Sequence, residues 1–256
     1  MESLKETLSS VVLSLTDKCN RHCKFCPHGN GFEPMLEDMT VSTAANISRF
    51  LNGFTGRVRL SGYGEPLLNC NILEIVDVLK RGIDGDFELI TNGDLLNEYF
   101  IHALLSAGIT RIVVSMHDGS EQASFFKDMF ENVNTKDYEL RSHWDAQQTF
   151  NSRCGHAYES TKTPVKRVCY LPFYKMRIDS NGDVGLCCQD WGKTVVIDNV
   201  ANGNLEEMWL SDKLNMYRRQ LLFGGRVLLP CSTCDVIGDV YGKESFDRFK
   251  ESWINQ

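Results

Sequence analysis

Long apolar runs are absent from this chain of 256 residues. No stretch approaches the roughly 18 apolar residues that a membrane-spanning helix needs. The first six residues, MESLKE, also lack the basic-then-apolar order of a secretory signal peptide. These absences predict a cytoplasmic protein without a membrane partner.

Runs of basic residues are absent too. The chain carries 34 acidic and 27 basic side chains, which gives a formal net charge of −7. Binding to nucleic acid depends on contacts between cations and phosphates, so this balance argues against a nucleic-acid partner. The chain has no long internal repeat, and its length and 42% hydrophobic content suit one sizeable domain with a small appendage.

Cysteine, in contrast, is abundant, with ten residues. Disulfides are rare in the cytosol, where thiols are kept reduced. We therefore interpret most of these cysteines as metal ligands or reactive thiols. Cys70 is the exception, because a free cysteine of this kind is usually a small buried residue.

Three cysteines fall within residues 19–26, which read CNRHCKFC. Cys19, Cys23 and Cys26 have C-x3-C-x2-C spacing. A [4Fe–4S] cluster needs four ligands, so three thiolates leave one iron open to chelate a small molecule. The alternatives are zinc, which usually takes a closed set of four ligands, and a chance grouping in a reduced core.

Four more cysteines form a second candidate ligand set, Cys169, Cys187, Cys231 and Cys234. Four thiolates can close either a structural zinc site or an iron–sulfur cluster, and spacing alone does not decide between them. Cys188 directly follows one of the four, and neighbours on a strand point to opposite faces. Only one of the adjacent pair is then expected to reach the metal, and we favour Cys187.

Short apolar runs alternate with helical patterns over the first part of the chain. The predicted strands are 11–15, 57–61, 87–90, 112–115 and 138–143, and the predicted helices are 41–53, 72–79 and a segment around 104–105. This alternation indicates right-handed βαβ units and a parallel sheet. Unusual segments follow four of these strands, at 19–26, 62–66, 91–94 and 115–117. That placement is typical of the active-site rim of an α/β barrel, here an incomplete one because five or six strands are predicted.

The pattern changes after about residue 160. Residues 173–178 and 183–186 flank the turn sequence DSNG and predict a β-hairpin. Apolar residues at helical spacing follow, namely Leu205, Met208, Trp209, Met216 and Leu221, with Trp209 expected in the core. We predict three parts, a barrel at 1–159, a small appended domain at 160–240 and a C-terminal tail or helix at 241–256.

The C-x3-C-x2-C motif, with Phe25 before its last cysteine, resembles the signature of the radical S-adenosylmethionine (radical SAM) superfamily. The resemblance implies a partial (β/α)6-type barrel in which the open iron chelates the amino and carboxylate groups of SAM. It also implies an electron donor such as flavodoxin or ferredoxin. Reductive cleavage of SAM then gives a 5′-deoxyadenosyl radical, which abstracts a hydrogen atom from a small-molecule substrate.

The later cysteines resemble a second module of the same superfamily. A cysteine hairpin, then GNLEEMW at 203–209, then a C-x2-C knuckle are similar to the twitch domain, a shortened SPASM domain. The resemblance implies an auxiliary [4Fe–4S] cluster with full ligation by Cys169, Cys187, Cys231 and Cys234. A cluster without an open iron can accept an electron but is poorly placed to bind substrate.

The segment GYGEP at 62–66 resembles the Gly-Gly-Glu-Pro motif of the family, although alone it also fits a plain strand-to-helix turn. Gly64 allows close backbone approach, and the Glu65 carboxylate or nearby carbonyls suit the ammonium group of SAM. The candidate cofactor-binding residues implied in this way are Phe25, Gly62, Tyr63, Gly64, Glu65, Thr91, Asn92 and Ser115.

Over nearly its whole length the chain resembles short twitch enzymes that oxidise a secondary alcohol of an aminocyclitol to a ketone. Their Asn-Arg-Gly-Gly stretch matches SRCG at 152–155, which implies that Arg153 lies near the substrate. A guanidinium stays protonated below about pH 12, so it is suited to stabilise negative charge on the substrate oxygen. The candidate proton acceptors are His117 and Asp190.

Cys154 replaces a glycine of those enzymes and leaves a second outcome open. A thiol beside Arg153 is suited to donate a hydrogen atom to a carbon radical, which is the chemistry of a radical SAM carbohydrate epimerase. A peptide-modifying maturase is a third candidate, disfavoured because only about ten residues precede the first predicted strand. A non-enzymatic role, as a structural cluster protein or an electron carrier, is also disfavoured, because such a protein does not need the Gly-Glu-Pro rim.

Overall fold

The computed structural model describes residues 4–144, 151–157, 164–236 and 246–247. Its centre is an eight-stranded sheet in the order β5-β4-β3-β2-β1-β6-β7-β8. The strands are β1 (Ser10–Leu13), β2 (Arg57–Leu60), β3 (Phe87–Thr91), β4 (Arg111–Met116), β5 (Tyr138–Ser142), β6 (Lys175–Ile178), β7 (Asp183–Gly185) and β8 (Val196–Asn199). The sheet does not close on itself, since β5 and β8 are its edges.

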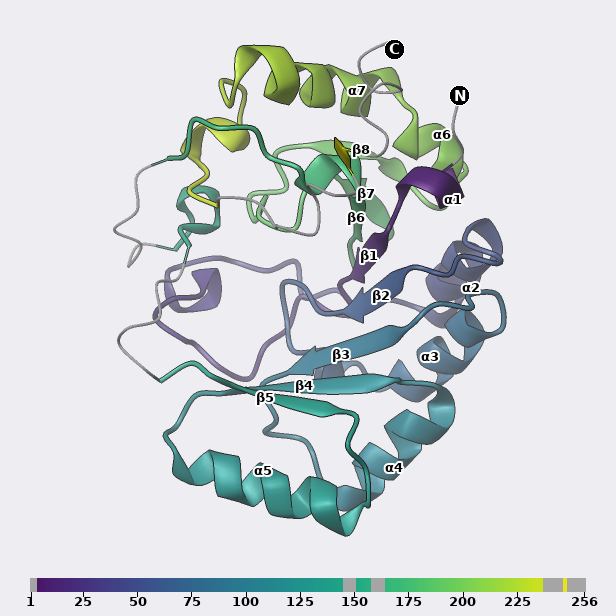
Figure 1. Cartoon of the computed structure of the whole chain (residues 1–256), viewed down its shortest axis with the longest axis vertical. Helices are drawn as coiled ribbons and strands as arrows, with labels where there is room; N and C mark the ends of the chain where they lie inside the picture. Colours follow the sequence, from purple (N-terminus) through teal and green to yellow (C-terminus); the bar gives the residue numbers. More distant parts are fainter. Residues whose placement is uncertain (1–3, 145–150, 158–163, 237–245, 248–256) are drawn as a thin grey trace.

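The first five strands run parallel, and a helix follows each of the first four. The helices are α1 (Leu4–Thr7), α2 (Val41–Phe50), α3 (Ile72–Lys80), α4 (Glu98–Ala107), α5 (Glu121–Asn132), α6 (Leu205–Trp209) and α7 (Asp212–Arg219). Figure 1 shows α2, α3 and α4 along one side of the sheet. The predicted α/β class and the incomplete barrel are confirmed, whereas α5 and β8 have no counterpart among the predicted elements.

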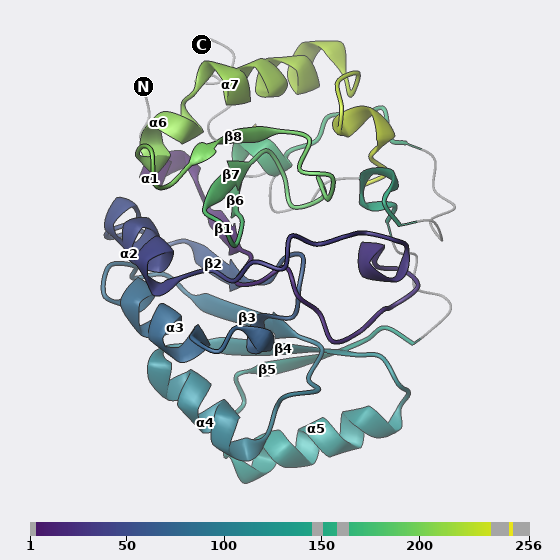
Figure 2. The same ribbon diagram turned by 180° about the vertical axis from the view of Figure 1, so that it is seen from behind.

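The predicted hairpin is present but does not stand apart from the barrel. Strand β6 pairs in parallel with β1, with Val11 opposite Met176, and β7 pairs antiparallel with β6. One sheet therefore runs across the predicted boundary between 1–159 and 160–240 (Figure 2). The division into these parts stays a prediction, and most of the predicted tail at 241–256 lies outside the described residues.

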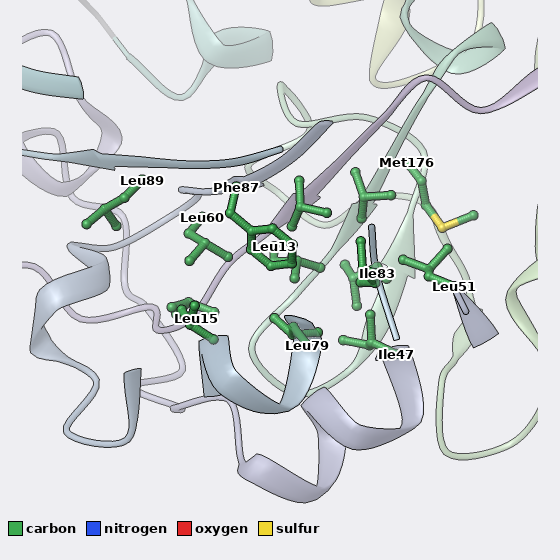
Figure 3. Packing of buried hydrophobic residues seen from close by; sticks show 14 of the residues in the cluster. Leu13, Leu15, Ile47, Leu51, Leu60, Leu79, Ile83, Phe87, Leu89 and Met176 are labelled. Atoms are coloured by element: carbon green, nitrogen blue, oxygen red, sulfur yellow. The ribbon is translucent and has the colours of Figure 1, made fainter. Parts of the chain in front are cut away.

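The main core lies between the sheet and the helices α2 and α3. Leu13, Leu60 and Phe87 come from three adjacent strands and are completely buried. Ile47 and Leu79 face them from α2 and α3 (Figure 3). Burial of each such side chain contributes about 1.5–3 kcal/mol relative to exposure, so this layer fixes the strands whose ends carry the site.

A smaller core lies under α6 and α7. Trp209 is buried as predicted, and its Nε1 donates a hydrogen bond to Thr7 Oγ1 at 2.8 Å. The buried Arg218 guanidinium lies 4.2 Å from the Trp209 ring centroid. Two predictions about burial are wrong. Met216, which was predicted in the apolar stripe, is 45% exposed, and Cys70 is exposed instead of buried. No described helix is long and apolar enough to cross a membrane.

Candidate active site

The four unusual segments of the sequence lie together at one edge of the sheet. Each follows the carboxyl end of a strand, at 19–26 after β1, 62–66 after β2, 91–94 at the end of β3 and 115–117 at the end of β4. Because these strands are parallel, their carboxyl ends meet at the same rim.

The loop after β1 gathers three half-buried thiols, those of Cys19, Cys23 and Cys26. Burial raises the pKa of the Cys23 thiol to about 11, and the negative charges of the other two thiolates act in the same direction. Burial also raises the pKa of Cys19 and Cys26. Three thiolates are stable together only beside a cation, so this donor set fits a metal cluster.

A single ion and a cluster place different demands on their ligands. A [4Fe–4S] cluster binds each thiolate through a different iron, and its ligands therefore lie further apart than those of one zinc ion. Among the described residues, no group of three His, Cys, Asp or Glu side chains is arranged to hold one ion.

Arg21, inside the cysteine loop, joins the ends of β3 and β4. Its guanidinium makes two hydrogen bonds to Asp94, at 2.7 and 2.5 Å, and two to Asp118, at 2.8 and 2.6 Å. Asn20 bridges the same loops, since it donates to Asp94 and accepts from Asn92, both at 2.8 Å. This network holds the cysteine loop on the rim. The only sign of it in the sequence is that Asn20 and Arg21 lie inside the cysteine motif.

Glu65 joins the loop after β2 to the end of β3. Its buried carboxylate accepts hydrogen bonds from Thr91 Oγ1 at 2.6 Å, from the Asn92 amide at 2.8 Å and from the Leu67 amide at 3.1 Å. Both carboxylate oxygens are therefore already used as hydrogen-bond acceptors within the protein. Of the two predicted partners for the SAM ammonium, these contacts favour the nearby carbonyls over the Glu65 carboxylate.

The two glycines of the 62–66 segment are required by close packing. A Cβ on Gly64 would lie 2.2 Å from the Lys18 carbonyl oxygen, and a Cβ on Gly62 would lie 2.4 Å from Ser14 Oγ. The segment therefore lies directly against the chain that leads into the cysteine loop. Ser115, another candidate contact, lies inside β4, one residue before its end.

Tyr63 points from this segment toward the loop after β7. Its hydroxyl donates to the Asp190 carbonyl oxygen at 2.7 Å and accepts from Arg177 Nη1. The Asp190 carboxylate oxygens accept from the amides of Thr194 and Val195, at 3.0 and 2.9 Å, and are buried. Both residues thus hold the structure together, and these contacts argue against Asp190 as a proton acceptor.

A stack of three rings covers the cysteine loop. Phe25 lies 5.7 Å from His117 and 5.8 Å from His143, and the two histidine rings are 5.4 Å apart. His117 Nδ1 is 3.9 Å from the Cys23 sulfur. Burial lowers the pKa of His117 to about 4, and the nearby His143 acts in the same direction. The imidazole is therefore neutral near pH 7.

The second cysteine group lines one small cavity. Its lining includes all four predicted ligands, Cys169, Cys187, Cys231 and Cys234, and in addition Cys154. Cys187 lines this cavity and Cys188 does not, which supports Cys187 as the ligand. Interaction with Cys234 raises the pKa of the Cys154 thiol, and interaction with Cys154 lowers that of Cys234.

Arg226 also lines this cavity. Its side chain is buried, and its Nη2 has no hydrogen-bond partner among the described residues. The guanidinium lowers the pKa of Cys169 and Cys231, against the larger effect of burial. A buried cation with an unused donor beside a ring of thiols fits an anionic iron–sulfur cluster.

Arg153 lies between the two cysteine groups. Its charge lowers the pKa of Cys26 in the first group and of Cys188 beside the second, in each case against burial. Its Nη1 donates to Gln189 Oε1 at 3.2 Å, and its Cζ lies 6.0 Å from the Trp191 ring. The predicted substrate residue thus contacts the lining of the auxiliary cavity through Gln189 and interacts through its charge with Cys26.

Comparison with known proteins agrees with this architecture. The profile of the radical SAM superfamily matches residues 13–143, more than half of the chain. The chain belongs to the radical SAM superfamily. The profile of the SPASM iron–sulfur cluster-binding domain matches residues 169–235. As a radical SAM protein with a SPASM domain, the chain is an enzyme that uses SAM, with one SAM-binding and one auxiliary [4Fe–4S] cluster.

Two relatives illustrate the range of the superfamily. The S-adenosyl-L-methionine-dependent 2-deoxy-scyllo-inosamine dehydrogenase of Niallia circulans is 24% identical over 250 residues, which cover 95% of this chain and 99% of that protein. A GTP 3′,8-cyclase of Aquifex aeolicus is 36% identical, but over only 46% of this chain and 38% of the cyclase. The dehydrogenase is therefore similar from end to end, and the cyclase only in part.

The fold agrees with that of a solved structure. The crystal structure of BtrN in complex with AdoMet and 2-DOIA has a TM-score of 0.80 and 23% identity, and the match covers 90% of this chain and 94% of BtrN. The predicted membership of the radical SAM superfamily, with a SPASM-type domain, is confirmed.

Proposed function

We propose that this radical SAM enzyme oxidises a secondary alcohol of an aminocyclitol or a similar sugar-like molecule to a ketone. The observation that carries the proposal is the contact of Arg153 with Gln189, which lines the auxiliary cavity together with Cys154; its charge also lowers the pKa of Cys26 in the first cysteine group, against burial. A substrate held there is next to the SAM site and next to an electron acceptor. The end-to-end similarity to an aminocyclitol dehydrogenase supports the same reaction.

The first cysteine group supplies the radical chemistry. A reduced cluster held there would supply the electron for SAM cleavage, and the 5′-deoxyadenosyl radical would remove a hydrogen atom from the carbinol carbon. Cys19, Cys23 and Cys26 are the proposed ligands, and a flavodoxin or ferredoxin is the proposed electron donor. The proposed SAM contacts are Phe25, Gly62, Tyr63, Gly64, Thr91, Asn92 and Ser115, with Glu65 holding their loops together.

Completion of the ketone requires the loss of one proton and one electron from the substrate. Arg153 would stabilise the negative charge that develops on the oxygen as the proton leaves. His117 is the proton acceptor that the geometry favours, since it lies on the rim and the Asp190 oxygens are occupied. The auxiliary cluster would take the electron. Its proposed ligands are Cys169, Cys187, Cys231 and Cys234.

The epimerase alternative depends on Cys154 as a hydrogen-atom donor. Cys154 lines the auxiliary cavity together with the four proposed ligands. A donor to a substrate radical must instead face the substrate. This placement favours oxidation over inversion, and inversion is treated as an outcome of the final experiment below.

The test is SAM cleavage by the reconstituted, reduced enzyme under anaerobic conditions. We expect 5′-deoxyadenosine to form with 2-deoxy-scyllo-inosamine or with another member of a panel of aminocyclitols, sugars and nucleotide sugars. Cys23→Ala should abolish it, whereas Cys231→Ala should still permit some cleavage. If only peptide substrates raise the yield of 5′-deoxyadenosine, the enzyme is a maturase and the proposal is wrong.

A further inference from the structure

A cavity of about 340 Å³ lies at the amino ends of β1, β2 and β6, opposite to the rim that carries the proposed SAM site. Ligand pockets in proteins range from roughly 300 to 1,000 Å³, so this cavity is large enough for a small molecule. Its lining includes three cations, Arg57, Arg59 and Lys175, and one carboxylate, Asp86. Among the described residues, none of the cysteines and none of the candidate SAM contacts lines it. The cavity is therefore a separate site with an excess of positive charge.

The register of the sheet places three of the lining residues in one row. Ser10 is the partner of Arg57 on β2 and of Lys175 on β6. Residues paired in this way point to the same face of the sheet, and successive residues along a strand alternate between the two faces. Met176, which follows Lys175, lies in the core on the side of α2 and α3 (Figure 3). The row of three therefore shares the face that points away from these helices.

Ser10 lies between the two cations and has an unused hydroxyl group. The residue is 7% exposed, and its Oγ has no hydrogen-bond partner among the described residues. A buried hydroxyl without a partner costs free energy, and a ligand in the cavity can supply the missing bond. Neighbouring strands lie about 4.8 Å apart. The long side chains of Lys175 and Arg57 can therefore both reach a group held above Ser10.

The two cations of the row are not neutralised by close ion pairs. Lys175 Nζ lies 5.2 Å from the centroid of the Tyr174 ring, and no ion pair joins it to a carboxylate of the described residues. The Arg57 guanidinium approaches Glu88 only to 3.7 Å, whereas Arg59 pairs with the same carboxylate at 2.8 Å. Both Lys175 and Arg57 thus have donors available for an anion.

We propose that this row binds the phosphate group of a small molecule, with Lys175 and Arg57 on either side of it and the Ser10 hydroxyl beneath it. A tetrahedral phosphate offers acceptor oxygens in several directions, which suits donors that come from three neighbouring strands. Arginine and lysine are common partners of phosphate in proteins.

The phosphate belongs either to the substrate or to a separate effector, and only the first source rests on the proposed oxidation. The rim begins near Ser14, against which Gly62 packs. Ser10 is about 13 Å from Ser14 along the strand. A substrate that reaches both the phosphate site and the rim must therefore be elongated, as a nucleotide sugar is.

The experiment measures phosphate binding to the full-length, anaerobically reconstituted enzyme by isothermal titration calorimetry. Saturating SAM is present throughout, so that the probes do not bind at the SAM site. The probes are inorganic phosphate and glucose 6-phosphate. The variants compared with wild type are Lys175→Gln, Arg57→Gln, Ser10→Ala, Asp86→Asn and the control Lys127→Gln.

We expect Lys175→Gln and Arg57→Gln each to weaken phosphate binding by about tenfold or more, because each change removes a charged donor. Asp86→Asn should strengthen binding by about threefold, since it removes a negative charge from the same cavity. Ser10→Ala should weaken binding by about threefold without lowering the midpoint of denaturant unfolding, because its hydroxyl has no partner to lose. Lys127→Gln, on the exposed face of α5, should leave binding unchanged.

The proposal is overturned if neither probe binds, or if Lys175→Gln and Lys127→Gln bind phosphate equally well. The yield of 5′-deoxyadenosine then distinguishes the two sources. A phosphate on the substrate predicts a higher yield with phosphorylated sugars or nucleotide sugars than with the free sugars, and loss of this difference in Lys175→Gln. A separate effector predicts phosphate binding without such a difference. Because binding needs no turnover, failure of the proposed oxidation would leave the phosphate site untouched, and failure of the phosphate site would leave the oxidation untouched.

Discussion

The Tyr63 hydroxyl donates a hydrogen bond to the Asp190 carbonyl oxygen at 2.7 Å. Tyr63 belongs to the loop that packs against the chain leading into the first cysteine group, and Asp190 closely follows Cys187 of the second group. Arg177 donates both to this hydroxyl and to the same carbonyl oxygen. Through this contact the SAM side of the enzyme and the auxiliary site are parts of one rigid core.

Tyr63→Phe should therefore destabilise the protein. The change removes two buried hydrogen bonds, one to the Asp190 carbonyl oxygen and one from Arg177, which still bond to each other, and loss of each bond costs about 0.5–1.5 kcal/mol. Anaerobic denaturant unfolding measures this free energy. Tyr99→Phe is the matched control, because Tyr99 is 84% exposed. Equal stabilities of the two variants would contradict the structural role of Tyr63.

Glu65→Gln should weaken SAM binding by about tenfold or more. An amide supplies one oxygen where the carboxylate supplies two, so either the Asn92 amide or the Thr91 hydroxyl faces a second donor. The loops after β2 and β3 would then lose their common anchor. Equilibrium dialysis of the reconstituted enzyme with SAM measures the affinity. Glu74→Gln, at an exposed position on α3, should leave it unchanged; unchanged affinity in Glu65→Gln itself would refute this role.

Arg226→Gln should lower the reduction potential of the auxiliary cluster. Removal of a buried positive charge beside the cavity favours the less negative, oxidised state of the cluster. A charge interaction of about 1 kcal/mol corresponds to roughly 40 mV for one electron. A potentiometric titration followed by electron paramagnetic resonance measures the shift. Lys127→Gln, on the exposed face of α5, serves as the control. A potential equal to that of wild type would show that Arg226 does not face the cluster.

Arg153→Gln should slow ketone formation by about 100-fold or more, as expected when a charge that stabilises a developing oxyanion is lost. Reductive SAM cleavage without substrate should change little, because Arg153 is assigned to the substrate and not to SAM. Arg81→Gln, on the surface at the end of α3, controls for the loss of a charge. An equal fall in both reactions would assign Arg153 to the cofactor side instead.

Much of the fold could be predicted from the sequence, because strands β1 to β5 and helices α2 to α4 follow local apolar periodicity. The cysteine loop and the hairpin turn also carry local signals. The parallel pairing of Val11 with Met176 could not be predicted, since it joins residues far apart in the chain. The exposure of Met216 was missed for a related reason: the chain begins a new helix at Asp212, which rotates the apolar stripe.

The candidate site, like the fold, could be predicted only where local sequence carries the signal. The residue types and spacing of Cys19, Cys23 and Cys26 indicate cluster chemistry without any structure. The double ion pair of Arg21 and the position of Cys154 depend on loops that meet only in the folded chain. The role of Asp190 as a proton acceptor stays a prediction, and the sequence could not show that its carboxylate accepts hydrogen bonds from two backbone amides.

The most direct test of the proposed oxidation is product analysis after turnover in deuterated water. We expect a ketone, formed in step with 5′-deoxyadenosine, and Cys154→Ala should still form it. An alcohol inverted at its carbinol carbon and carrying solvent deuterium, lost in Cys154→Ala, would instead show that the enzyme is an epimerase.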